Sequence, residues 1–183
     1  MPKNIIIFIL VLFLFKISLC DVNEENRKKM EKIYGENKEI TGDYDNELSA
    51  TCNNGIFVGT KKDDVISFKG IPYAKPPTGD LRWKDPILAE DDTKVYEAYY
   101  FGKTPIQTEK DSDLGTYYPK SEDCLYLNIW KNSKDTSKNK PIMVYIHGGS
   151  YRRGSTTTPL YDGYNLVEKY PDIIFASIEY RLG

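Results

Sequence analysis

The chain has 183 residues, of which 40% are hydrophobic and 13% aromatic, so it can build one domain around an apolar core. Its 25 basic and 27 acidic residues give a net charge of −2, which provides no electrostatic reason to expect a nucleic-acid partner. Three Cys are too few for a disulfide-rich scaffold, and one His cannot build the usual multi-histidine metal sites. We therefore expect no metal and no other cofactor.

Residues 1–20 have the features of a secretory signal peptide. Lys3 precedes an uncharged apolar run over residues 5–15, and small residues then stand three positions and one position before Asp21. The run is well short of the ~20 residues that cross a bilayer. We expect cleavage before Asp21, an extracellular location and no membrane span afterwards. A retained signal anchor is the alternative.

Residues 21–47 form a highly charged segment in which apolar residues are widely spaced. A charge run of this kind is usually solvated. We interpret it as an exposed N-terminal arm, with a helix around residues 24–34, and assign it no function. The folded domain is expected to occupy residues 48–183.

Turn signals dominate the first half of that domain. Asn53-Asn54-Gly55 can supply the positive φ of a tight turn. Apolar runs at 56–59 and 65–68 predict strands on either side of a second turn at 61–64. Repeated prolines predict an irregular segment over residues 70–86.

Regular elements dominate the last third. After a polar loop at 103–120, residues 124–130 alternate as a half-buried strand does. The apolar runs at 142–146 and 173–178 suit strands buried on both faces, and residues 161–170 have helical spacing. Strand, glycine turn, helix and strand make the βαβ pattern of an α/β sheet.

Five short sequence phrases along residues 55–183 together carry a family resemblance. They are Phe68-Lys-Gly-Ile-Pro-Tyr-Ala74 with Pro76-Pro-Thr-Gly79, Leu81-Arg82-Trp83, Ser121-Glu-Asp-Cys-Leu-Tyr-Leu-Asn-Ile-Trp130, Tyr145-Ile-His-Gly-Gly-Ser150 and Glu179-Tyr-Arg-Leu-Gly183. In this order they resemble the type-B carboxylesterase and cholinesterase-like family. The resemblance implies an α/β-hydrolase fold, a serine-hydrolase ancestry and a small-molecule ester as substrate.

The fourth phrase resembles the family's oxyanion loop. Ester hydrolysis passes through a tetrahedral intermediate whose negative oxygen is stabilised by fixed backbone N–H donors. By resemblance, the donors are the N–H groups of Gly149 and Ser150, where Ser150 replaces the family's usual third glycine. Gly148 and Gly149 let the backbone approach a ligand closely. His147 is expected to shape the loop and not to act as a base. Taken alone, His-Gly-Gly would also suit a turn that ends a strand.

The resemblance assigns structural roles to other side chains. Arg82 and Glu122 match one family ion pair. Cys124 matches a signature Cys whose usual partner is replaced by proline here, so we expect free thiols, with a Cys52–Cys124 bridge as the alternative. Arg181 matches half of a second ion pair whose acid would lie downstream. In a family-like sheet, Arg181 would then be an uncompensated buried charge.

The sequence contains no Gly-x-Ser-x-Gly elbow, which holds the family's nucleophile, and the base would lie later still. We therefore expect the N-terminal portion of a secreted carboxylic-ester hydrolase that acts through an acyl-serine intermediate, inactive alone. Its fold would be an incomplete α/β-hydrolase sheet, with the N-terminal hairpin and the first central strands. An open sheet edge, exposed apolar surface and poor folding should follow.

The alternative function is a cholinesterase-like adhesion or interaction protein that binds a protein partner without catalysis. Ser150 fits that branch equally well. The reading frame beyond codon 183 would separate the two.

Overall fold

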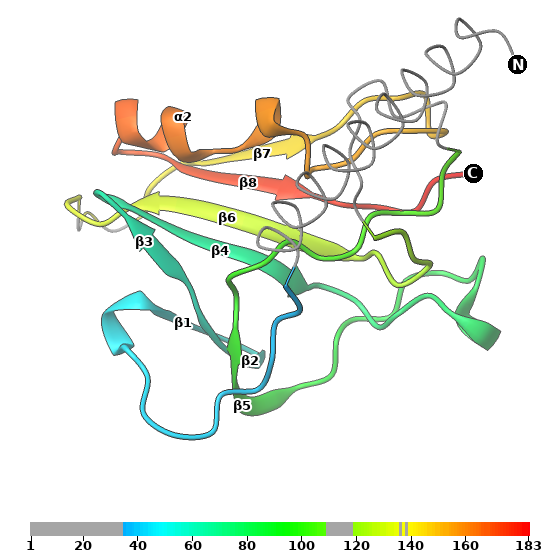
Figure 1. Ribbon diagram of the computed structural model, residues 1–183, viewed down its shortest axis with the longest axis horizontal. Coiled ribbons are helices and arrows are strands. Elements are labelled where there is room, and N and C mark those ends of the chain that lie inside the picture. The colour runs from blue at the N-terminus through cyan, green and yellow to red at the C-terminus, as the bar shows by residue number, and fades with distance from the viewer. Residues whose placement is uncertain (1–34, 109–118, 136, 138) are drawn as a thin grey trace, which may run out of the picture. The chain divides into compact units, whose positions relative to one another are not determined.

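The computed structural model describes residues 35–108, 119–135, 137 and 139–183 (Figure 1). Two β-sheets and a short α-helix make up this part of the chain. The predicted signal peptide and the helix expected around 24–34 lie outside the described residues. The same holds for 109–118 of the predicted polar loop.

The smaller sheet has the strand order β1-β2-β5. Its strands are β1 (Ser49–Cys52), β2 (Asn54–Val58) and β5 (Asp92–Glu97), and a 3-10 turn, η1 (Asn46–Leu48), precedes β1. Strands β1 and β2 are antiparallel, and Gly55 has a φ of 136°, which confirms the predicted tight turn. Strand β5 pairs in parallel with β2 and was not expected from the sequence.

The described part of the charged arm pairs with the smaller sheet. The backbone of residues 38–40 runs along β5, where Ile40 N–H donates to the Val95 carbonyl and Glu97 N–H donates to the Lys38 carbonyl, both at 2.8 Å. The Asn37 side chain also accepts hydrogen bonds from two backbone amides and donates to two carbonyls. The side chains of this segment remain mostly exposed. Backbone pairing therefore docks a segment whose charged composition predicts only solvation.

The larger sheet has the strand order β3-β4-β6-β8-β7. Its strands are β3 (Thr60–Lys62), β4 (Val65–Pro72), β6 (Tyr126–Asn132), β7 (Ile142–Ile146) and β8 (Ile174–Ile178). Asp63 takes a φ of 52° in the β3–β4 hairpin, so a turn forms where predicted. The strand that precedes this turn is 60–62, however, because 56–58 pairs within the smaller sheet.

The βαβ prediction is confirmed over residues 142–178. Strands β7 and β8 are parallel neighbours, and α2 (Tyr164–Lys169) lies between them in sequence. The helix is shorter than the expected 161–170. Residues Pro159–Tyr161 form a 3-10 turn, η4, and Pro171 restricts the backbone just after the helix ends.

Each face of the larger sheet has an apolar cluster. Helix α2 packs over β4, β6 and β8, where Trp130, Val167 and Phe175 are buried. A second cluster joins the two sheets and contains Phe57, Ile66, Phe68, Ile71 and Ala98. Adjacent residues of β4 belong to different clusters, because successive side chains of a strand point to opposite faces of the sheet. Between β4 and β5 the chain is irregular, with a 3-10 turn, η2, at Gly79–Leu81.

Strand β7 is not buried on both faces, so that expectation is wrong for this chain. It is the terminal strand of the larger sheet, and Ile142 and Ile146 are 61% and 66% exposed. Met143 and Val144 are also exposed. Among the described residues, β7 has a strand neighbour on one side only, and its apolar side chains are exposed, as the sequence predicts.

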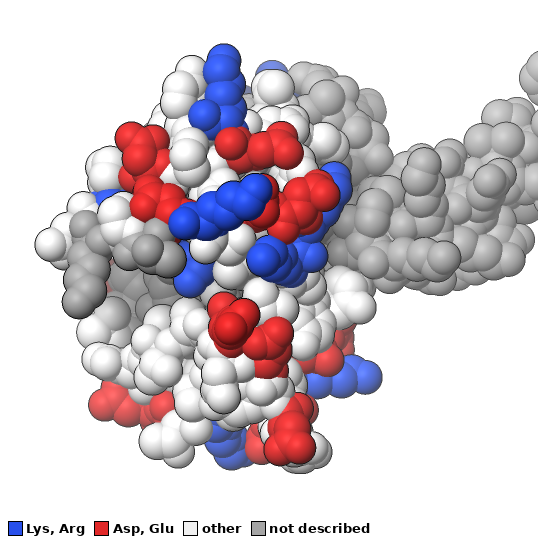
Figure 2. All heavy atoms as spheres, turned by 90° about the vertical axis from the view of Figure 1, so that its left-hand side faces the viewer, with Lys and Arg blue, Asp and Glu red and all other residues white. Residues whose placement is uncertain are grey.

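Charged side chains are mixed over the face shown in Figure 2, where basic and acidic groups lie next to each other. Ion pairs in the described chain include Lys134 with Asp64 at 2.6 Å and Lys94 with Glu39 at 2.8 Å. Within the described ranges, no helix is long and apolar enough to cross a membrane.

Candidate active site

The loop after β7 has an unusual backbone. Gly149, Ser150 and Tyr151 have φ values of 124°, 56° and 58°. The Gly149 carbonyl accepts hydrogen bonds from the amides of Arg152 at 3.0 Å and Arg153 at 3.2 Å. A Cβ on Gly149 would lie 1.9 Å from the Arg153 carbonyl oxygen. Only glycine fits there, whereas Ser150 and Tyr151 hold a conformation that costs a non-glycine residue about 1–3 kcal/mol.

The loop leaves its two predicted donors available. Neither the Gly149 N–H nor the Ser150 N–H has a hydrogen-bond acceptor among the residues that the structure describes. Ser150 is exposed and Gly149 is half-buried. The Tyr151 carbonyl accepts a 2.8 Å hydrogen bond from Gly183 N–H, which holds the loop against the segment after β8.

His147 lies under this loop and is only 2% exposed. Its Nε2 is 3.1 Å from Glu179 Oε1, its Nδ1 is 3.0 Å from the Gly148 carbonyl oxygen, and its ring stacks on Tyr180. Burial alone would lower the pKa of His147, but the hydrogen bonds to Glu179 and Gly148 and the charge of Glu179 together raise it above its ordinary value.

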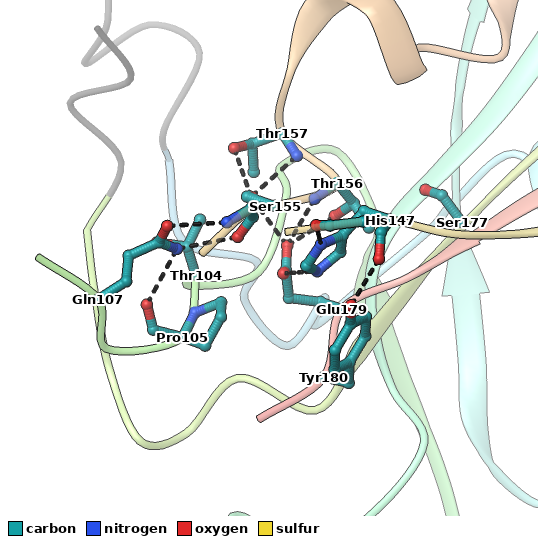
Figure 3. Close-up of polar contacts among 12 residues, drawn as sticks. Thr104, Pro105, Gln107, His147, Ser155, Thr156, Thr157, Ser177, Glu179 and Tyr180 are labelled. Atoms are coloured by element: carbon teal, nitrogen blue, oxygen red, sulfur yellow. Dashed lines mark hydrogen bonds and ion pairs between the residues drawn. The ribbon is translucent and has the colours of Figure 1, made fainter. Parts of the chain in front are cut away.

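Glu179 is the centre of a buried polar cluster (Figure 3). It is 2% exposed, and its Oε2 accepts hydrogen bonds from the Ser155 hydroxyl, the Thr156 N–H and the Thr156 hydroxyl at 2.8–2.9 Å. Asn128 Nδ2 donates to the hydroxyls of Thr156 and Ser177 at 3.2 Å. Strands β6 and β8 and the turn at 155–158 are thereby joined beneath the loop.

Gln107 holds the far end of the loop through both groups of its side-chain amide. Its Oε1 accepts from Gly154 N–H at 3.0 Å and its Nε2 donates to the Gly154 carbonyl at 2.9 Å (Figure 3). A Cβ on Gly154 would lie 2.4 Å from the Gly148 oxygen and 2.5 Å from His147 Nδ1. The loop therefore closes on itself with no room for a side chain at Gly154.

The structure brings two of the predicted structural side chains together. Arg82 Nε lies 2.5 Å from Glu122 Oε1, with the two side chains 57% and 38% exposed. Arg181 is half-buried, and its guanidinium donates to the Lys84 carbonyl at 2.9 Å. The expectation of a buried and uncompensated Arg181 is therefore wrong here, because its side chain is only partly buried and has a carbonyl partner.

Both cysteines of the described chain are free thiols. Cys52 is exposed, whereas Cys124 is buried. Burial, followed by the nearby charge of Glu179, raises the pKa of the Cys124 thiol to about 12. Cys124 is therefore unsuited to act as a thiolate nucleophile at neutral pH.

The sequence pointed to His147 but did not reveal Glu179, Ser155 or Thr156 as part of the site. One signal was present in the sequence, a run of four hydroxyl residues at 155–158. The structure buries all four. No group of three or more His, Cys, Asp or Glu side chains in the described ranges could hold a metal ion. What remains is an exposed loop above buried polar contacts, with two N–H donors that have no acceptor among residues 35–108, 119–135, 137 and 139–183.

Comparison with known proteins gives consistent matches. The carboxylesterase family model matches residues 46–183. Para-nitrobenzyl esterase of Bacillus subtilis (strain 168) is 42% identical over 136 residues, which cover 73% of this chain and 27% of that protein. The cholinesterase of Mus musculus is 35% identical over 127 residues, covering 65% of this chain and 21% of that protein.

Comparison with solved structures also finds carboxylesterases. A thermophilic PNB esterase superposes with a TM-score of 0.69 at 38% identity, covering 75% of this chain and 28% of that one. The EST55 carboxylesterase of Geobacillus stearothermophilus gives a TM-score of 0.65 at 34% identity, covering 74% and 26%. The chain thus spans about a quarter of the length of its relatives. By sequence and by fold, it belongs to the carboxylesterase family of α/β hydrolases.

Proposed function

We propose that this chain supplies the oxyanion loop of a secreted carboxylic-ester hydrolase that reacts through an acyl-serine intermediate. The N–H groups of Gly149 and Ser150 would bind the carbonyl oxygen of a small ester. The nucleophile, acid and base would come from sequence outside residues 1–183, which contain no Gly-x-Ser-x-Gly.

One observation carries this proposal. Two adjacent N–H groups lie on an exposed loop without acceptors among the described residues, and that loop is held by buried contacts on its inner side. Donors fixed in advance are what an oxyanion requires, because they need not reorganise when charge develops.

The chemistry defines what this chain can and cannot do. A serine oxygen attacks the carbonyl carbon, a base accepts the serine proton, and the carbonyl oxygen becomes negative. Donors at that oxygen lower the barrier, and loss of one typically costs about 3–4 kcal/mol. Donors without a positioned nucleophile cannot start the reaction, so residues 21–183 alone should be inactive.

The first test measures hydrolysis of p-nitrophenyl acetate by residues 21–183 beside Gly149→Pro and Ser150→Pro, each of which deletes one N–H. All three should match the rate in buffer. A rate above buffer that falls in either variant would overturn the inactivity.

The second test uses the protein translated from the whole transcript, which should contain the missing serine. There Gly149→Pro and Ser150→Pro should each lower kcat at least about 10²–10³-fold, because proline deletes the N–H and also cannot adopt the positive φ of either position. Asn46→Pro is the matched control, because it places proline at the first position of the exposed 3-10 turn η1, where proline is tolerated. Equal activity in all three variants would refute the proposed role of the loop.

Nothing described above favours the adhesion alternative. A reading frame that continues beyond codon 183 without the elbow serine would support it instead.

We also propose that residues 1–20 are removed on export, so that the mature chain begins at Asp21, with residues 48–183 as part of the hydrolase domain. The charged start and the apolar run over residues 5–15 support this. N-terminal sequencing of the secreted product tests it. A cytosolic product that begins at Met1 or Pro2 would contradict it.

A further inference from the structure

The imidazole ring of His147 lies between two hydrogen-bond acceptors. Its Nε2 is 3.1 Å from Glu179 Oε1 (Figure 3), and its Nδ1 is 3.0 Å from the Gly148 carbonyl oxygen. A neutral imidazole has one N–H and can donate to only one of them, whereas the imidazolium donates to both. If both partners act only as acceptors, the arrangement is fully hydrogen-bonded only when both ring nitrogens carry a proton.

The second oxygen of Glu179 indicates where that extra proton lies. Oε2 accepts hydrogen bonds from the Ser155 hydroxyl at 2.9 Å, from the Thr156 N–H at 2.9 Å and from the Thr156 hydroxyl at 2.8 Å. Donors aimed at a carboxylate stabilise its ionised form. This geometry favours placing the extra proton on the imidazole, whose Nε2 faces Oε1.

The Gly148 carbonyl shares a peptide plane with one of the proposed oxyanion donors. The bond between Gly148 and Gly149 is trans, so this C=O and the Gly149 N–H point in opposite directions within one plane. A hydrogen bond that fixes the carbonyl toward His147 also fixes the N–H away from it. The backbone of Gly154 packs against the hydrogen bond between His147 and the Gly148 carbonyl, so that a Cβ at Gly154 would not fit.

We propose that His147, kept protonated by Glu179, is a positioning residue that locks the Gly148–Gly149 peptide, so that the direction of one oxyanion donor depends on a buried proton. This inference rests on the proposed role of the Gly149 N–H. Loss of the proton from Nδ1 would leave two acceptors facing each other at 3.0 Å and release the peptide to rotate.

Aromatic, basic and acidic groups surround the ring. Tyr180 stacks on it with ring centroids 4.3 Å apart, and the Tyr180 hydroxyl donates to the backbone carbonyl of His147. Tyr151 lies edge-on against Tyr180. The basic residues of the adjoining segments are Arg152, Arg153 and Arg181, of which Arg181 is engaged with the Lys84 carbonyl. Glu179 is thus the carboxylate in hydrogen-bond contact with the ring.

The direction of the pH dependence follows from these contacts. The pKa of His147 is raised in the folded chain, because the two hydrogen bonds and the charge of Glu179 outweigh the lowering by burial. The stabilisation is therefore complete below the ordinary value of 6.5 and is lost as the pH rises through the raised value. The loop should be ordered below the raised pKa of His147 and loosen as the pH rises through it.

The test uses the single His of the sequence. The full chain is labelled with ¹⁵N at histidine and glycine, and NMR follows both ring nitrogens and the Gly149 amide from pH 5 to 10. We expect a His147 midpoint above 6.5, with the Gly149 amide shifting at the same midpoint. A midpoint at or below 6.5, which an unfolded chain would also give, overturns the proposal. So does a Gly149 amide that stays constant while His147 titrates.

A pair of variants separates positioning from general stability. Glu179→Gln should lower the His147 midpoint by about one to three pH units, the range for loss of a neighbouring opposite charge. Glu47→Gln removes the same charge from an exposed turn and should leave the midpoint unchanged. Equal midpoints in both variants would refute the role of Glu179. Because the unmodified chain is titrated first, failure of Glu179→Gln to fold does not remove the test.

The readout does not depend on ester turnover. A coupled titration together with a full-length protein that lacks esterase activity would refute the proposed function and leave the coupling established. In an active parent, kcat should fall above the His147 midpoint while KM changes little, and Glu179→Gln should move that fall to lower pH.

Discussion

Adding one methyl group at Gly149 should disrupt the oxyanion loop, whereas the same change at Gly148 should not. At Gly149 the φ is 124°, and a Cβ would lie 1.9 Å from the Arg153 carbonyl oxygen. At Gly148 no atom lies within 4 Å of a Cβ, and φ is outside the left-handed region. Two neighbouring glycines therefore form a matched pair that differs only in backbone geometry and space.

Two costs add for Gly149→Ala. Holding alanine at such a φ costs about 1–3 kcal/mol, and overlap with packed atoms typically costs about 1–3 kcal/mol more. We expect the free energy of unfolding to fall by about 2 kcal/mol or more. Gly148→Ala should stay within about 0.5 kcal/mol of the unmodified chain or stabilise it slightly, because alanine restricts the unfolded state.

Urea unfolding followed by tryptophan fluorescence measures the global effect. Hydrogen exchange of the Arg152 and Arg153 amides measures the local effect, because both donate to the Gly149 carbonyl. These amides should exchange faster in Gly149→Ala and be unaffected in Gly148→Ala. Equal unfolding free energies and equal exchange in the two variants would refute the reasoning from backbone geometry.

Trp130→Ala should destabilise the fold by about 3–5 kcal/mol in urea unfolding, because this side chain is 1% exposed in the cluster under α2; a loss below about 1 kcal/mol would contradict that packing. A double-mutant cycle on Arg82 and Glu122 should give a coupling of about 0.2–1 kcal/mol, since both are partly exposed, and zero coupling would remove the contact. Cys52 should react with a thiol reagent in the native chain, whereas Cys124 should react only after denaturation; equal rates would show that Cys124 is accessible.

The sequence predicts an element well where the pattern is local. Strand β8 and the exposed loop after β7 follow from an apolar run and from consecutive glycines, which reflect burial and backbone freedom at the residues themselves. Strand β5 was missed because Asp-Thr-Lys-Val-Tyr-Glu has no apolar alternation. It is a strand because it pairs with β2 and with the arm. The residues of β5 alone do not indicate either partner.

Glu179 shows the same limit at the site. An acidic residue at the end of a buried strand resembles a surface position, because its burial depends on donors elsewhere. Those donors come from Ser155 and Thr156, more than 20 positions earlier in the chain. The phrase His-Gly-Gly predicts the loop. The Glu179 carboxyl group that supports the loop is recognised only in the fold, where the end of β8 lies beneath the loop.

Strand β6 decides how the larger sheet can assemble. It pairs with β4 on one side and with β8 on the other, so without it the β3–β4 hairpin and the β7–α2–β8 unit have no common edge. Its first partner on β4, Pro72, lies more than 50 positions before Tyr126, and closing such a loop costs about 3–4 kcal/mol of chain entropy. The hairpin and the βαβ unit can form from nearby residues, whereas β6 must join them across long distances in sequence. Substitutions within β6 should therefore slow folding itself, and until β6 inserts, the nascent chain presents two further unpaired strand edges.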